Sequence, residues 1–96
     1  MTIGILGGGV WGSALARVLS NNKVIIYARD EKIVKSINEH KINPKLKYSS
    51  FNENVTATTS LKEIRNVKFL FITLPAQSIR EVIKDSSLHN KNHHIV

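Results

Sequence analysis

Residues 2–12 read TIGILGGGVWG, and this stretch decides the fold expected for the chain. Thr2–Leu6 is a short run without charge, typical of a central strand that is buried on both faces of a parallel sheet. Three glycines follow directly, and Trp11–Ser20 then shows the apolar period of a helix. The apolar side chains expected on one face of that helix are Ala14, Leu15, Val18 and Leu19.

The next segments repeat this alternation of strand and helix. Lys23–Ala28 predicts a second strand, and Asp30 is a suitable N-cap for a second helix. The buried face of that helix is expected to carry Ile33, Val34 and Ile37. Residues 41–54 are polar and show no clear period, so we expect a long connection there.

The second half of the chain predicts further strands and helices. Thr56–Thr58 indicates a short strand, and Ser60–Glu63 has the S-x-x-E pattern of a capping box that opens a short helix. Val67–Leu74 is strongly apolar and predicts a strand. Pro75 suits the first turn of a following helix, because its missing N–H costs nothing there. His93–Val96 indicates the opening of another strand.

The glycines at positions 7, 9 and 12 match the G-x-G-x-x-G fingerprint of dinucleotide-binding folds, between an expected strand and an expected helix. Gly7 would permit the tight turn, and Gly9 would let the backbone approach a pyrophosphate. Gly12 would let the helix pack close to the strand, so that free N–H groups at its positive end meet the phosphate. The alternative is a glycine-rich turn without a ligand.

The order of these elements predicts an α/β fold with a doubly wound, mainly parallel sheet of the Rossmann type. Right-handed crossovers would place the first strand centrally. Because the chain stops at the opening of a strand, we expect residues 1–96 to be an incomplete N-terminal part of a dinucleotide-binding domain.

The end of the second strand should decide which dinucleotide binds. A carboxylate there favours the ribose 2′-hydroxyl of NAD(H), whereas an arginine accommodates the 2′-phosphate of NADP(H). The chain carries both, as Arg29 and Asp30. A solvated turn is the alternative role for Arg29, and a helix N-cap is the alternative role for Asp30. We therefore expect NADP(H) to be preferred, with NAD(H) as the second choice.

Composition excludes several other classes of protein. The 96 residues contain no cysteine, which argues against a disulfide-stapled module, a zinc finger or a thiol enzyme. No run approaches the roughly 18–20 apolar residues of a membrane span, so we expect no membrane insertion and a cytoplasmic location. The net charge of +7 is spread along the chain, so a nucleic-acid partner is not expected. His89, His93 and His94 do not suggest a metal site, because adjacent strand residues diverge.

Several motifs resemble, in order, those of bacterial NAD(P)-dependent glycerol-3-phosphate dehydrogenase. Residues 7–16, GGGVWGSALA, are similar to the family's G-x-G-x-W-G-T/S-A-L-A opening, and residues 27–30, YARD, to its W-x-R-D strand end. Residues 57–61, ATTSL, are similar to A-T-T-D-L, and residues 74–82, LPAQSIREV, to V-P-S/A-Q-x-x-R-E-V. Ile37-Asn38 and Asn43 match the I-N…N spacing. The resemblance covers almost the whole chain.

The resemblance implies hydride transfer between NAD(P)H and dihydroxyacetone phosphate, which feeds glycerophospholipid synthesis. Val10 and Trp11 would lie against the nicotinamide dinucleotide, Arg29 at its 2′-phosphate end, and Pro75 near it. The connection after the second helix departs from the family's N-x-x-Y-L-P-G block, which leaves Tyr48 as a candidate contact only.

The resemblance also implies what residues 1–96 lack. The family's catalytic lysines and its helical C-terminal domain, which binds the small phosphorylated substrate, would lie beyond Val96. We therefore expect no catalytic residue in this chain, no activity of the chain alone, and a homodimer for the full-length form. The alternative function is a non-catalytic dinucleotide-binding module or a different Rossmann reductase.

Overall fold

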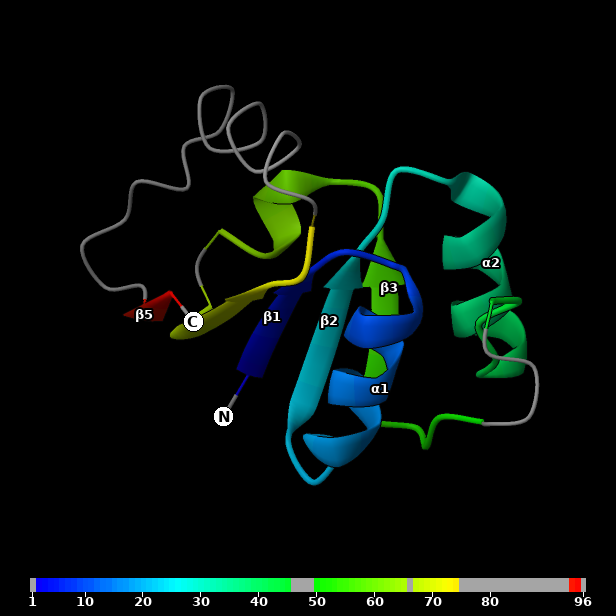
Figure 1. Cartoon of the computed structure of the whole chain (residues 1–96), viewed down its shortest axis with the longest axis horizontal. Coiled ribbons are helices and arrows are strands. Elements are labelled where there is room, and N and C mark those ends of the chain that lie inside the picture. Colours follow the sequence, from blue (N-terminus) through cyan, green and yellow to red (C-terminus); the bar gives the residue numbers. More distant parts are fainter. Residues whose placement is uncertain (1, 46–49, 66, 75–93, 96) are drawn as a thin grey trace.

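The computed structural model describes residues 2–45, 50–65, 67–74 and 94–95. These residues form a parallel sheet of five strands in the order β3-β2-β1-β4-β5, with the helices packed against it (Figure 1). The elements in chain order are β1 (Thr2–Leu6), α1 (Val10–Val18), β2 (Lys23–Tyr27), α2 (Glu31–His40), β3 (Val55–Thr58), the 3-10 helix η1 (Leu61–Glu63), β4 (Phe69–Ile72) and β5 (His94–Ile95). The expected parallel α/β fold is confirmed, with β1 in the centre. The helix expected from Pro75 lies outside the described residues.

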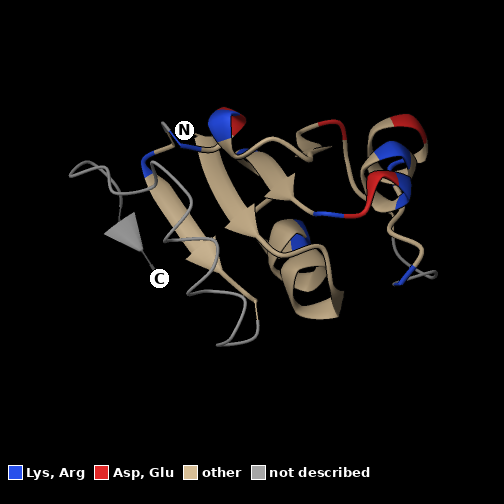
Figure 2. Ribbon diagram, turned by 90° about the horizontal axis from the view of Figure 1, so that it is seen from above, with Lys and Arg blue, Asp and Glu red and all other residues tan. Residues whose placement is uncertain are grey.

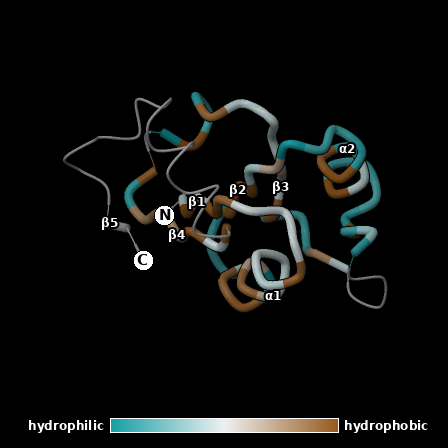
Figure 3. Tube along the Cα trace, turned by 45° about the horizontal axis from the view of Figure 1, so that its top comes forward, coloured by the Kyte–Doolittle hydropathy of each residue, from teal (hydrophilic) through white to brown (hydrophobic). Residues whose placement is uncertain are grey.

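The sheet separates two hydrophobic clusters, because successive strand residues point to opposite faces. Ile5 packs into the cluster covered by α1 and α2, whereas its neighbour Leu6 packs into the cluster beside η1. Figure 3 shows apolar residues gathered on the strands and on the side of α2 that faces them. Members of the first cluster include Ala16, Val24, Ile26, Ile33, Ile37 and Val55. The second contains Leu6, Tyr27, Ile64, Val67 and Leu70.

The buried face of α1 differs from the expected one. Val18 is 76% exposed and Ala14 is also exposed, while Leu15 and Leu19 are only partly buried. The fully buried residues of α1 are small: Gly12, Ser13 and Ala16. Small side chains carry little hydrophobic signal. The spacing of the apolar residues therefore predicted the wrong buried face for α1. The small residues let α1 lie close to the sheet.

The capping box expected at Ser60–Glu63 is absent. The Ser60 side chain makes no capping hydrogen bond, and the helix that follows is a single 3-10 turn. The Glu63 N–H, which a capping box would give to the serine hydroxyl, donates instead to the Ser60 carbonyl at 3.2 Å. The Ser60 N–H donates to Thr58 Oγ1 at 3.0 Å. The tight turn therefore satisfies these groups without the side-chain cap.

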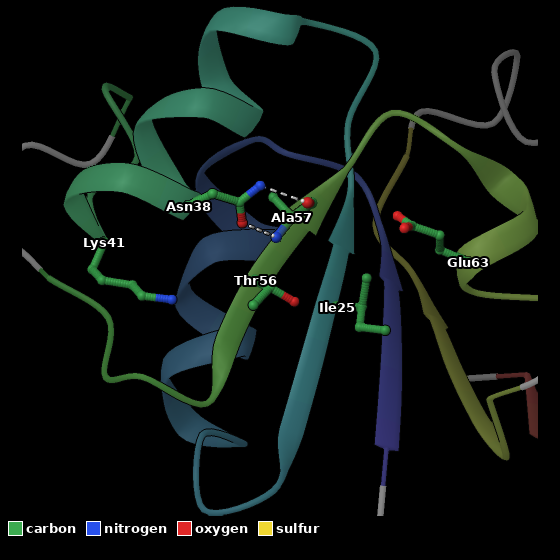
Figure 4. Close-up of a pocket in the computed structure, with 6 residues that line it drawn as sticks. All are labelled: Ile25, Asn38, Lys41, Thr56, Ala57 and Glu63. Carbon is green, nitrogen blue, oxygen red and sulfur yellow. Dashed lines mark hydrogen bonds between the residues drawn. The ribbon is translucent and has the colours of Figure 1, made fainter.

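Strand β3 lies at the edge of the sheet, and side chains of the α2 segment occupy its outward-facing backbone groups. Asn38 accepts from the Ala57 N–H at 2.8 Å and donates to the Ala57 carbonyl at 2.9 Å (Figure 4). Lys41 Nζ donates to the Val55 carbonyl at 2.7 Å. An unpaired strand edge is a template for pairing with another chain. This edge is closed by the chain's own side chains.

We predict that Asn38→Ala lowers the free energy of unfolding by about 1–2 kcal/mol, because both Ala57 backbone groups lose their partner. Urea unfolding followed by circular dichroism measures the change. Glu39→Ala is the matched control, since this exposed neighbour lies 4.0 Å from His40, its one ion-pair contact within the described part of the chain. It should change stability by less than about 0.5 kcal/mol. Equal stability of the two variants would show that the amide does not hold the edge.

Candidate functional site

The glycine turn after β1 is packed against the carboxyl ends of the neighbouring strands. Gly7 has a φ of +131°, a conformation that favours glycine, and its N–H donates to the Tyr27 carbonyl at 2.9 Å. A Cβ on Gly7 would collide with Thr73 Oγ1, and a Cβ on Gly12 would collide with the Gly7 carbonyl oxygen. The tight turn expected at Gly7 and the close packing expected at Gly12 are both present.

Thr73 supports this turn from the end of β4, although no pattern in the sequence singles it out. Its N–H and its hydroxyl both donate to the Leu6 carbonyl, each at 2.9 Å. The hydroxyl also stands where side chains on Gly7 or Gly12 would have to go. Thr73 therefore binds β4 to the last residue of β1. Its hydroxyl also limits how closely the glycine turn can approach the end of β4.

The N-terminus of α1 opens away from the protein. Gly9 is the N-cap residue, its extended φ of −85° suits any residue, and a Cβ added there would meet nothing within 4 Å. Val10 is 49% exposed and Trp11 is 81% exposed. The first N–H groups of a helix have no partner within the helix, and they carry the positive end of its dipole. This open helix end is suited to an anion such as a pyrophosphate.

The end of β2 brings Arg29 and Asp30 beside the glycine turn. Asp30 caps α2, because its side chain accepts from the Lys32 N–H at 2.9 Å. This confirms the capping role that was one of its two expected roles. Arg29 is exposed at the strand end. Figure 2 shows the basic and acidic colours meeting where β2 leads into α2.

A cavity of about 390 Å³ joins the glycine turn to the end of β2. This volume is in the usual range for small-molecule sites. The residues that line it are Gly7, Gly8, Gly9, Tyr27, Ala28, Arg29, Asp30, Ile33, Lys45, Thr73 and Leu74. Four of the expected site residues, Gly7, Gly9, Arg29 and Asp30, are thus brought together. Val10, Trp11 and Gly12 begin the adjoining helix, while Tyr48 and Pro75 lie outside the described residues.

Asn43 links the connection after α2 to the glycine turn, and sequence reasoning assigned it no role. It is fully buried, and its Nδ2 donates to the Gly8 carbonyl at 2.8 Å and to Ser13 Oγ at 2.5 Å. Its Oδ1 accepts from the Lys45 N–H at 3.0 Å. Its place in the I-N…N spacing was the only signal in the sequence. The buried amide fixes where residues 43–45 pass beside the site.

A second cavity, of about 580 Å³, lies at the β3 edge of the sheet and is lined by Ile25, Asn38, Lys41, Thr56, Ala57 and Glu63 (Figure 4). The polar ends of Asn38 and Lys41 are bound to the β3 backbone. They are therefore committed to the edge of the sheet rather than to a ligand.

The described part of the chain gives no sign of a metal site or a membrane span. It contains no group of three or more His, Cys, Asp or Glu residues that could hold a metal ion. Within the same residues, no helix has the length and apolar character to cross a bilayer. His89 and His93 lie outside the described residues.

The parallel sheet and the glycine turn place the chain in the class of Rossmann-type domains. The family model described as "NAD-dependent glycerol-3-phosphate dehydrogenase N-terminus" matches residues 2–96. The chain belongs to this family, which confirms the resemblance found in its motifs and disfavours a different Rossmann reductase. The family also agrees with the expectation that the cofactor is a nicotinamide dinucleotide, whether NAD(H) or NADP(H).

Individual relatives agree with the family. The chain is 42% identical over 88 residues to glycerol-3-phosphate dehydrogenase [NAD(P)+] of Bacillus licheniformis and 36% identical over 83 residues to that of Neorickettsia sennetsu. These alignments cover 84% and 83% of the chain but 25% of each relative, so the chain spans about a quarter of the relatives' length.

Solved structures show the same relationship. The crystal structure of glycerol-3-phosphate dehydrogenase from Coxiella burnetii superimposes with a TM-score of 0.87 at 29% identity, covering 98% of this chain and 30% of that one. D-mandelate dehydrogenase with NADH and anilino(oxo)acetate gives a TM-score of 0.68 at 21% identity, covering 99% and 32%. The second likeness shows the fold alone.

The glycines of the turn differ in what a side chain would meet, which gives a stability prediction. We predict that Gly12→Ala lowers the free energy of unfolding by about 2–3 kcal/mol, because the new Cβ collides with the Gly7 carbonyl. Gly9→Ala, whose Cβ enters open space, should cost less than about 1 kcal/mol. Thermal and urea unfolding of both variants measure the difference, and equal losses would contradict the close packing at Gly12.

Proposed function

We propose that this chain is the cofactor-binding part of an sn-glycerol-3-phosphate dehydrogenase. Such an enzyme transfers hydride between NAD(P)H and dihydroxyacetone phosphate in glycerophospholipid synthesis. The observation that carries the proposal is the glycine turn that leads from β1 into an open helix N-terminus, beside the cavity that ends at Arg29 and Asp30. The names of the relatives and the family match support it.

In this proposal the turn binds the pyrophosphate. Gly9 leaves the space beside the helix end open, since a Cβ there would have no neighbour within 4 Å. Gly7 and Gly12 keep the turn tight enough for the first N–H groups of α1 to point at the phosphate oxygens. Exposed Val10 and Trp11 lie against the dinucleotide and shield one side of it.

NADP(H) is the preferred cofactor in this proposal, and NAD(H) the second choice. Arg29 lines the cavity at the end of β2, where the adenosine ribose of a Rossmann domain lies, and its guanidinium suits a phosphate. Asp30 already accepts a backbone N–H as the cap of α2, which competes with binding a ribose hydroxyl. Tyr48 and Pro75 complete the set of proposed contacts.

The chemistry of the reaction is divided between this chain and the rest of the enzyme. The bound dinucleotide supplies the hydride, and the residues of this chain bind and orient it. The proposal assigns residues 1–96 to the N-terminal part of the domain. It assigns the small phosphorylated substrate, the proton donor and the homodimer contacts to a helical C-terminal domain. A cytoplasmic location belongs to the same proposal.

Cofactor binding can be measured with the chain's single tryptophan, which lies at the start of α1. We predict saturable quenching of Trp11 fluorescence by NADPH and, at higher concentrations, by NADH. Arg29→Ala should weaken NADPH binding by about tenfold, because a charge-assisted contact worth about 1.4 kcal/mol is lost. The chain alone should not oxidise NADPH when dihydroxyacetone phosphate is added.

Gly9→Ala tests the pyrophosphate site in the same titration. It should remain folded and lose most of its affinity for both dinucleotides, because its methyl group fills the space that the pyrophosphate needs. A folded wild-type chain that responds to neither dinucleotide would overturn the proposed function. Unchanged affinity in Gly9→Ala would overturn the assignment of the pyrophosphate to this turn.

A further inference from the structure

The charges around the cavity do not come from the end of β2 alone. Among the described residues that line it, the charged ones are Arg29, Asp30 and Lys45. Arg29 and Asp30 are adjacent in sequence and opposite in sign, so together they carry no net charge. Lys45 makes this end of the cavity positive. A phosphate monoester, which carries about two negative charges at neutral pH, favours such a site.

Lys45 is brought to the cavity by a buried contact rather than by the end of a strand. The Asn43 side chain holds the Gly8 carbonyl and Ser13 with Nδ2, and it accepts the Lys45 N–H at 3.0 Å with Oδ1. Asn43 is completely buried, so this short segment has a defined path beside the glycine turn. The Lys45 side chain is exposed at the cavity, where it can reach a ligand.

We propose that Lys45 is a second cation of the 2′-phosphate site and acts with Arg29 to select NADP(H) over NAD(H). This inference rests on the proposed function. The pyrophosphate already has partners in the N–H groups at the start of α1. The 2′-phosphate would meet Arg29 next to the Asp30 carboxylate, which repels it, and Lys45 offsets that repulsion.

The test compares two lysines that differ in their relation to the cavity. Lys45→Met should raise the Kd for NADPH by about fivefold and the Kd for NADH by less than about twofold, both measured by Trp11 quenching. Lys35→Met, which removes an exposed charge of α2 that does not line the cavity, should change neither. Lys45→Arg should retain the preference for NADPH.

The wild-type chain provides a test that needs no substitution. The ratio of NADPH to NADH affinity should fall when salt is raised from about 0.05 M to about 0.5 M, because screening weakens exposed charge pairs. An equal loss of both affinities in Lys45→Met would assign Lys45 to the pyrophosphate and overturn the inference. A Lys45→Met variant that keeps the wild-type preference for NADPH would also overturn it. Failure of the wild-type chain to bind either dinucleotide would instead overturn the proposed function itself.

Discussion

The contact between Gly12 and the Gly7 carbonyl oxygen is the constraint on which the site depends. It allows no Cβ at position 12, so the first turn of α1 sits directly on the glycine turn that ends β1. Thr73 closes the same space from β4 and binds the last carbonyl of β1. Because position 12 has no side chain, the first turn of α1 can pack directly on the glycine turn, and Gly9 at the start of the helix lines the cavity.

A second constraint joins this turn to the connection after α2. Asn43 is one of few buried polar residues among those described. Both the NH₂ group and the oxygen of its amide form hydrogen bonds. A buried amide without partners would cost about 1–3 kcal/mol. A different course of residues 43–45 that left the Asn43 amide buried and unbonded would therefore destabilise the fold. The path that satisfies Asn43 also places Lys45 at the cavity. Folding stability and the charge of the site thus depend on one side chain.

The strands, the central place of β1 and the glycine turn could be predicted, because period and glycine spacing are local properties of the sequence. The buried face of α1 could not, since Ser13 and Gly12 carry no hydrophobic signal. Thr73 and Asn43 were missed as supports of the site for a different reason. Each binds residues 30 or more positions away, and sequence spacing does not show such contacts.

Charge acts on the proposed ligand at two ranges. The net charge of +7 is spread over the chain and attracts any anion, so it raises the rate of encounter without distinguishing between dinucleotides. At about 0.15 M salt this attraction is screened beyond roughly 8 Å. Only charges that line the cavity can therefore separate two cofactors that differ by one phosphate. Asp30 offsets part of the charge of Arg29, so in the further inference the discrimination depends on Arg29 together with Lys45.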